Sequence, residues 1–206
     1  CITDSVTEIE GNPFKNCKAL RTVELSPNHP LLTVQDGMLI DHVHQRVLRR
    51  LTTGAVCIVP EGIKEIADGA FGRIPELTEI TLPQGLRTIG CHAFESTGLT
   101  ALKLPESLEE VGHGAFLSNE KLQEVTLPKN LRVIPIDMFY GCSELEKVVL
   151  PEKLERLEAS AFAFCEALTE IDLPEGVQFL GRNAFERCGF ASICITDSVT
   201  EIEGNP

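Results

Sequence analysis

The stretch LPEGVQFLGRNAF, residues 173–185, recurs along this chain with small changes. Close copies begin at positions 82, 104, 127 and 150, and in every copy the second residue is proline and the last is phenylalanine. The in-phase prolines lie 22 or 23 residues apart and are Pro60, Pro83, Pro105, Pro128, Pro151 and Pro174. A fixed period of this length is the signature of a repeat architecture. One unit cannot bury its own apolar face, whereas stacked units can, so the sequence predicts a solenoid.

Each unit follows the pattern L-x-x-I-x-L-P-x-x-L-x-x-I-x-x-x-A-F. In LTEITLP, residues 77–83, apolar Ile80 and Leu82 flank polar Thr81, which predicts a short strand with one buried face. Proline ends the strand because it cannot donate a hydrogen bond to a neighbouring strand. A second apolar pair and a turn follow, and the Ala-Phe pair returns to the interior. Equivalent residues of stacked units should therefore form columns about 4.8 Å apart.

Residues 27–59 interrupt the period, because 34 residues separate the in-phase positions Ser26 and Pro60. Residues 34–41 and 46–51 both suit strands, with the polar sequence HVHQ between them, and predict a β-hairpin that projects from the solenoid. The compact basic cluster of this acidic chain falls in the same segment and consists of His42, His44, Arg46, Arg49 and Arg50. Two interpretations stay open: a docking site for an acidic partner or a neighbouring subunit, or a solvated hairpin whose charges protect an exposed strand edge.

The first and last 13 residues of the chain are identical. Residues 1–13 and 194–206 both read CITDSVTEIEGNP, which gives a higher-order period of 193 residues. We therefore expect residues 1–206 to form a single solenoid domain that is a fragment of a longer repeat array. A recent duplication would explain the identity, and so would a deliberate choice of where this chain begins and ends.

Three marks of the repeat resemble the BspA-like leucine-rich repeats, also called the Treponema pallidum type. They are the recurring I-x-L-P, the Ala-Phe pair and the cysteine three residues after phenylalanine, at Cys17, Cys142, Cys165 and Cys188. The resemblance covers nearly the whole chain. It implies a right-handed leucine-rich-repeat superhelix, mostly β, of short strands and 3₁₀-like turns, often with an insertion that has a D-G-x-L start, here at Asp36. It also implies a bacterial protein that is secreted or displayed on the cell surface, often an adhesin.

The charge of the chain excludes some partners. The formal net charge is −13, from 18 Lys and Arg against 31 Asp and Glu. Phosphate binding needs clustered Lys and Arg, so we expect no nucleic-acid partner and no anionic membrane surface as a partner. No apolar run approaches the roughly 18 residues of a membrane span, so no direct membrane insertion is predicted.

The eight cysteines favour buried thiols over disulfides or a zinc site. Cys142, Cys165 and Cys188 form one column, where a small apolar side chain suits an inward turn. A disulfide between neighbouring units fits the expected Cα separation, but side chains in a column run parallel, and no C-x-x-C pair gives the spacing of a zinc site. His42 and His44 have no evident third ligand, and His92 and His113 are better explained as surface-turn residues than as a metal cluster. No metal or cofactor is therefore predicted.

No catalytic motif is present, because G-x-S-x-G, the phosphate-binding G-x-x-x-x-G-K-S/T and H-E-x-x-H are all absent. Asp and Glu fall in solvent-facing columns instead of a converging pair. The sequence therefore predicts a non-enzymatic module that binds a protein, or a host matrix or glycan ligand, through outward strand residues. The alternative is a structural spacer that presents another domain. Besides the basic residues of the insertion, the candidate contact residues are Thr78, Thr81, Thr100, Lys103, Gln123, Thr126, Glu146, Lys147 and Asp172.

Overall fold

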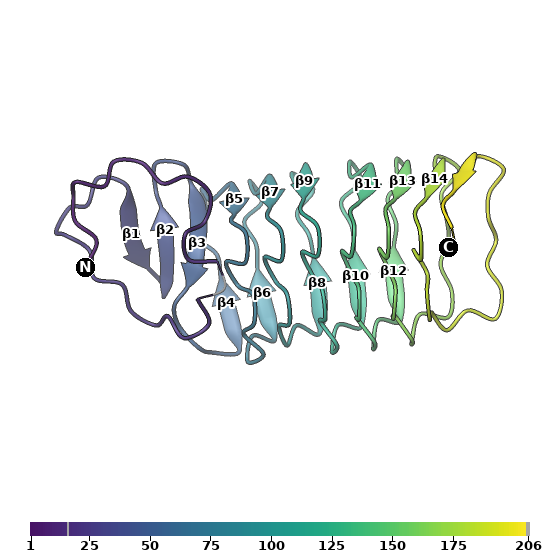
Figure 1. The fold of residues 1–206 in the computed structure, drawn as a ribbon, viewed down its shortest axis with the longest axis horizontal. Helices are drawn as coiled ribbons and strands as arrows, with labels where there is room; N and C mark the ends of the chain where they lie inside the picture. The colour runs from purple at the N-terminus through teal and green to yellow at the C-terminus, as the bar shows by residue number, and fades with distance from the viewer. Residues whose placement is uncertain (16, 205–206) are drawn as a thin grey trace.

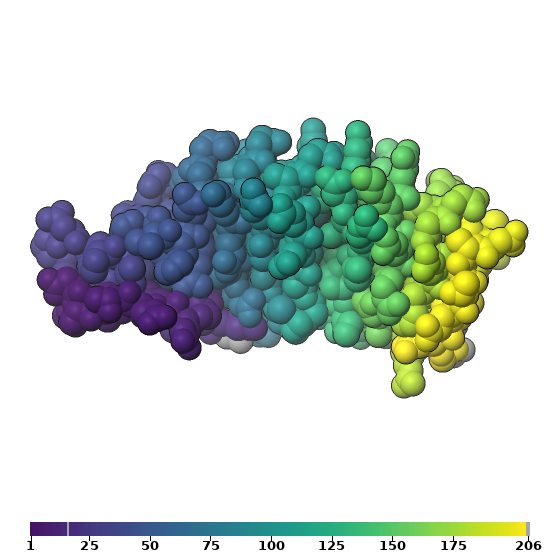
Figure 2. All heavy atoms as spheres, turned by 90° about the horizontal axis from the view of Figure 1, so that it is seen from above, coloured from purple at the N-terminus to yellow at the C-terminus, as the bar shows by residue number. Residues whose placement is uncertain are grey.

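The computed structural model describes residues 1–15 and 17–204 as an elongated coil whose two ends lie at opposite tips (Figure 1; Figure 2). Most turns of the coil carry two short strands, joined by tight turns such as the one closed by Leu86 N–H and Pro83 O. The described part of the chain contains no α-helix, and hence none long and apolar enough to cross a membrane. The predicted solenoid is confirmed.

The I-x-L-P segments form the first row of strands. Their alternate side chains point inward, as at the buried Leu102 and Val125, because successive residues of a strand face opposite sides. Neighbouring units pair in parallel and in register, with Glu124 opposite both Ala101 and Lys147. The strands of the first row are β4 (Val56–Ile58), β6 (Glu79–Thr81), β8 (Ala101–Lys103), β10 (Glu124–Thr126) and β12 (Lys147–Val149).

The second apolar pair of each unit forms a second row of parallel strands, of two residues each. Inward Ile89 and Leu157 of this row are fully buried. The strands are β5 (Glu65–Ile66), β7 (Thr88–Ile89), β9 (Glu110–Val111), β11 (Val133–Ile134), β13 (Arg156–Leu157), β14 (Phe179–Leu180) and β15 (Glu201–Ile202). The first row is interrupted between β6 and β8, and the second between β9 and β11.

Phenylalanine rings stack through the centre of the coil. Neighbouring rings have centroids 5.1–6.0 Å apart and planes within 16° of one another. This separation follows from the spacing of paired strands, and it suits the offset stacking of aromatic rings. The stacked residues are Phe71, Phe94, Phe116, Phe139, Phe162 and Phe185.

A second inward column lies three residues after each phenylalanine. The thiol of Cys142 donates to Phe116 O at 3.3 Å, and that of Cys165 donates to Phe139 O at 3.2 Å. Asn119 holds the same place in its own unit and donates to the equivalent carbonyl. All eight cysteines are free, and the predicted burial is found at Cys142 and Cys165, whereas Cys188 is half-buried and Cys17, at the same place in the first unit, is exposed. Burial raises the pKa of Cys142 to about 12.

Within the predicted insertion, residues 32–50 form three antiparallel strands, β1 (Leu32–Gln35), β2 (Met38–Asp41) and β3 (Arg46–Arg50). The segment 34–41, predicted as one strand, turns back at Asp36 and Gly37, whose φ angles are 49° and 71°. β3 pairs in parallel with β5, so the insertion extends the second row (Figure 1).

Both faces of the inserted sheet are buried. Met38 and Val47 pack into the phenylalanine core, whereas Leu39 and Leu48 pack into a second cluster that includes Phe14. The predicted hairpin is present as β2 and β3, with residues 42–45 between them, but the prediction that it projects from the solenoid is wrong. The insertion is a layer between the first repeat unit and the rest of the coil, because both of its sides are apolar.

Candidate partner-binding surface

The outward side chains of residues 78–81, 100–103, 123–126, 146–149 and 169–172 form a strip that we call the first-row face. Thr81, Lys103 and Thr126 are exposed at the ends of β6, β8 and β10. Of the nine contact residues predicted there, eight are exposed and Thr78 is half-buried. The solenoid therefore brings residues from five repeat units onto one surface.

The backbone under this strip is fixed, while its side chains stay free. The Thr78 hydroxyl donates to Ala55 O at 3.2 Å, which ties one unit to the previous one. Lys147 Nζ lies 3.9 Å from Glu124 Oε2, but their side chains are 66% and 57% exposed. Such an exposed ion pair contributes little to stability, so both charges remain free to contact a partner.

A hollow of about 470 Å³ lies at the carboxyl ends of β10 and β12. Thr126 and Val149, from the first-row face, form one side of it, and Lys129 and Lys153 are the cations of its lining. Val149 is 45% exposed, so the hollow offers apolar surface next to positive charge. The remaining lining residues are Glu106, Leu127, Asn130, Leu150, Pro151 and Glu152.

The predicted basic cluster is divided by the fold. His42 and His44 are exposed in the turn between β2 and β3, but Arg46 is half-buried and donates to Asp41 Oδ2 at 3.0 Å and to Ile9 O at 2.6 Å. Burial alone would raise the pKa of Asp41, but bonds from the His44 backbone and from the His44 and Arg46 side chains lower it below its usual value. Arg46 is thus a structural link between the insertion and the first unit.

Arg49 and Arg50 are buried, at 1% and 3% exposure, so neither belongs to an exposed cluster. Arg49 Nη1 donates to Gly69 O and Gly72 O at 2.8 and 3.3 Å, and Arg50 N–H donates to Ala70 O at 2.9 Å. In regular units the carbonyls equivalent to Ala70 O and Gly72 O accept from the turn of the preceding unit, as Ala93 O does from Phe71 N–H at 2.8 Å. The two arginines replace that turn where the insertion displaces it, and burial lowers the pKa of Arg49.

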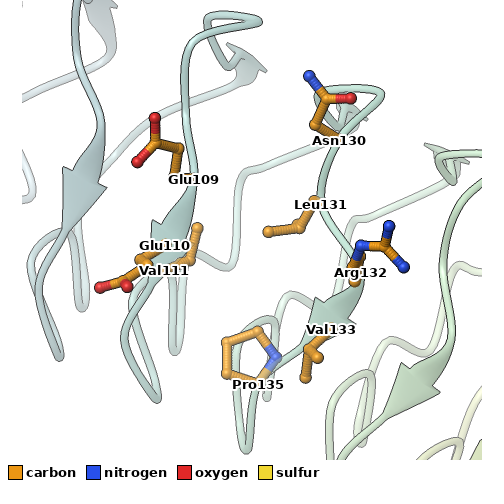
Figure 3. A pocket seen from close by; sticks show the side chains of 8 residues that line it. All are labelled: Glu109, Glu110, Val111, Asn130, Leu131, Arg132, Val133 and Pro135. Atoms are coloured by element: carbon orange, nitrogen blue, oxygen red, sulfur yellow. The ribbon is translucent and has the colours of Figure 1, made fainter.

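A second hollow, of about 360 Å³, lies between β9 and β11 (Figure 3) and was not predicted. In other units the residue after the second-row strand donates to the unit before, as Glu158 N–H does to Ile134 O at 2.9 Å. Pro135 holds this place after β11 and has no N–H, so Val111 O receives no such bond. The second row of strands is therefore interrupted between β9 and β11. A proline at this phase of the repeat was the available signal in the sequence.

The histidine pairs do not form a metal centre in the part of the chain that the structure describes, where no group of three or more His, Cys, Asp or Glu side chains is placed to hold an ion. The rings of His92 and His113 meet edge to face at 4.9 Å, and His92 Nδ1 lies 3.6 Å from Glu95 Oε2.

Stacked two-strand units with inward columns of Leu, Ile and Phe define a leucine-rich-repeat protein. The model of the BspA type leucine rich repeat region matches the chain in six copies, over residues 1–38, 55–155 and 132–205. The chain belongs to this family, whose members are generally protein-binding or surface repeat proteins.

Solved structures share the fold. A leucine-rich repeat protein from Eubacterium ventriosum matches with a TM-score of 0.74 at 22% identity, covering 93% of this chain and 59% of its own. One from Bacteroides ovatus matches with a TM-score of 0.64 at 24% identity, covering 84% and 52%. The Treponema pallidum leucine-rich repeat protein matches with a TM-score of 0.64 at 27% identity, covering 80% and 89%. The chain thus spans little more than half of the first two proteins. No curated protein matches it.

Proposed function

We propose that this chain is a secreted or cell-surface binding module, adhesin-like, whose first-row face engages an extracellular protein or glycan. The observation that supports this proposal is the exposure of eight of the nine predicted contact residues on the outer side of the first-row segments, of which β8, β10 and β12 are hydrogen-bonded to one another. Repeat proteins use such extended surfaces for binding. Affinity would arise from many polar contacts over several units, with the hollow beside Val149 accepting one apolar group.

Mixed charge on this face fits a partner with polar groups of both signs. Lys103 and Lys147 alternate along the strip with Glu79 and Glu124. Rim charges of this kind mainly affect the association rate and its salt dependence. Binding should therefore weaken as salt is raised.

The test is biolayer interferometry of the purified chain against a panel of extracellular matrix proteins and glycans, over a salt series. The variant Lys103→Ala with Glu146→Ala and Lys147→Ala should reduce binding at least about tenfold, since it removes three polar contacts. A matched control changes three exposed residues elsewhere: Lys18→Ala, Lys64→Ala and Glu175→Ala. If both variants lose the same amount of binding affinity, or if the loss of affinity accompanies unfolding, the first-row face is not the binding surface.

A spacer is the second candidate function, favoured by the identity of residues 1–13 and 194–206. Residues 1–13 and 194–204 lie at opposite tips of the rod (Figure 2). Blocks that repeat end to end extend a chain without creating a binding site. This alternative is supported if the chain binds nothing on the panel and the full-length protein binds through another domain.

A further inference from the structure

β4 has a free edge. It pairs with β6 on one side, and among the described residues no strand pairs with its other side. Ala55 O and Val59 N–H bond to the β6 unit. Backbone groups of alternate residues point to opposite edges of a parallel strand, so those of Val56 and Ile58 point to the free edge. The insertion adds no strand to this edge, because it continues the second row of strands and not the first. Within the described part of the chain, it bonds to the edge only through Arg50, whose Nη2 donates to Val56 O at 3.3 Å.

The free edge carries exposed β-branched side chains. Ile58 is 65% exposed and Val56 is 55% exposed, the two highest values among the exposed large apolar residues. Proteins usually protect such an edge with charge, proline or a covering segment. Here the outward side chains are apolar, which favours the addition of another strand.

A buried guanidinium lies behind the same edge. Arg50 is 3% exposed, and its Nη2 donates to Gly54 O at 2.9 Å and to Val56 O at 3.3 Å. Its Nε and Nη1 have no hydrogen-bond partner. The side chain forms no ion pair with any described carboxylate. A buried charge without a partner is costly, so this arginine favours the approach of an anion.

Arg50 and the edge strand line one hollow of about 460 Å³. Val56, Ile58 and Pro60 supply its apolar part, and Asp36 is the carboxylate in its lining. The remaining lining residues are Thr52 and Cys57. The hollow thus combines an apolar rim with a cation whose Nε and Nη1 have no hydrogen-bond partner, and a bond from such a charged donor to a carboxylate is stronger than a bond between neutral groups.

We propose that the free edge of β4 binds an extended peptide in which an acidic residue lies between two β-branched residues. The peptide pairs with the backbone groups of Val56 and Ile58, and its β-branched side chains pack beside these two residues. Because side chains alternate along a strand, the residue between them points the other way, into the hollow and toward Arg50. This site does not depend on the first-row face being the main binding surface.

The test compares two labelled peptides, SGTVEVTGS and SGTVQVTGS, by fluorescence anisotropy with the full chain. The glutamate peptide should bind at least about tenfold more tightly, the difference expected for bonds to a charged group. The change is made in the peptide because a substitution at Arg50 would also remove the bonds to Gly54 O and Val56 O. Equal affinity of the two peptides, or no binding of either, overturns the proposal.

The position of the site is tested with Ile58→Pro, which removes the edge N–H while the bonds to β6 remain, and with Ile58→Thr as the matched control that keeps the N–H. Binding should be lost in the first variant and largely kept in the second. If Ile58→Pro does not fold, the glutamate peptide is titrated into the unchanged chain and the NMR shifts of its backbone amides locate the site. Shifts confined to residues outside 50–60 overturn the proposal. The chain could instead associate with itself through this edge. If Ile58→Pro abolishes such self-association and the glutamate peptide does not displace it, the edge binds a second copy of the chain and the proposal is overturned.

Discussion

At the residue scale, each inward phenylalanine serves the fold in two ways. Its ring stacks on the rings of the neighbouring units, and its buried carbonyl needs a donor, as buried polar groups do. Phe116 O accepts from Asn119 Nδ2 of its own unit and from the thiol of Cys142 in the next, and Phe94 O accepts from Asn119. The recurring cysteine is thus explained by a weak S–H donor of small volume, without any disulfide.

Phe139→Ala should remove about 3–5 kcal/mol from the free energy of unfolding, because the ring is fully buried between two others and leaves a cavity. Urea-induced unfolding measures the change. Phe164→Ala is the control, since Phe164 is half-buried outside the column, and it should lower stability by about 1 kcal/mol or less. Similar losses in the two variants would place Phe139 outside the core.

His92 should make stability fall when the solution is acidified. Burial lowers the pKa of His92, and Glu95 opposes this while His113 and Lys15 reinforce it. A histidine with a pKa below its ordinary value of 6.5 binds fewer protons in the folded state. Its contribution to stability is therefore complete above pH 6.5 and is lost as the pH falls from 6.5 through the lower folded value.

The measurement is urea unfolding at pH 7.5 and pH 5.5. His92→Asn should show a smaller acid-induced loss of stability than the unchanged chain, and asparagine tolerates the positive φ of 53° at this position. His42→Asn, at an exposed turn, should behave like the unchanged chain. An identical pH dependence in all three proteins would contradict the role of His92.

The sequence predicts interior residues well where they repeat and poorly where the repeat is replaced. The inward Leu, Ile, Phe and Cys columns follow from the period alone. The charge of Arg49 and Arg50 predicts a place on the surface. The fold buries them instead, since Ala70 O and Gly72 O need donors where a turn is displaced, and this demand is visible only in three dimensions.

At the scale of elements, a unit shortened by one residue interrupts the first row of strands. Phe94 is 11 residues before Pro105, whereas Phe71 is 12 residues before Pro83. The shorter segment between Phe94 and Pro105 brings Gly98 so close to the preceding unit that a Cβ there would lie 2.2 Å from Pro75 O. Only glycine permits this approach, and the break in pairing between β6 and β8 lies directly after it.

Gly98→Ala should therefore destabilise the protein by about 1–3 kcal/mol, because backbone must move to accommodate the methyl group. Gly85→Ala is the control, since no atom lies within 4 Å of a Cβ at that position. It should leave stability unchanged or raise it by up to about 1 kcal/mol through the unfolded state. Thermal unfolding compares the two, and a neutral Gly98→Ala would show that the two units can separate freely.

The strand elements were predictable to different degrees. The I-x-L-P strands follow from alternation, whereas the second-row strands are two residues long, too short for any alternation to show. In the insertion, Asp36-Gly37 between apolar residues is the signal of a tight hairpin turn, although residues 34–41 also suit a single strand. The first-row face was predictable because its residues share one phase. The hollows were not, since they depend on how neighbouring units part.

At the scale of the whole molecule, the two identical ends have different environments. In the first copy, Ile2 N–H donates to Glu24 O at 2.7 Å, in the unit that follows. In the second copy, Glu201–Ile202 is β15 and pairs with β14, in the unit that precedes. The two identical copies therefore contact neighbours on opposite sides, and their structure is determined by position along the coil and not by local sequence.

Hydrogen exchange can measure this difference with an internal control, because equivalent amides in the two copies have the same sequence neighbours and hence the same intrinsic rates. Glu201 N–H donates to Gln178 O and Glu203 N–H to Leu180 O, whereas Glu8 and Glu10 donate to no backbone carbonyl in the described part of the chain. The amides of Glu201 and Glu203 should exchange at least about tenfold more slowly than those of Glu8 and Glu10.

Val6 and Val199 provide the control for this comparison, because each donates across its own turn, to Thr3 O and Thr196 O respectively, at 3.1 Å. Their amides should exchange at similar rates. If the glutamate amides also exchange at equal rates in the two copies, the pairing of β15 with β14 does not persist in solution, and the coil ends one unit earlier than the structure shows. If the glutamates differ while the valines agree, stacking on the preceding unit is what orders the last repeat.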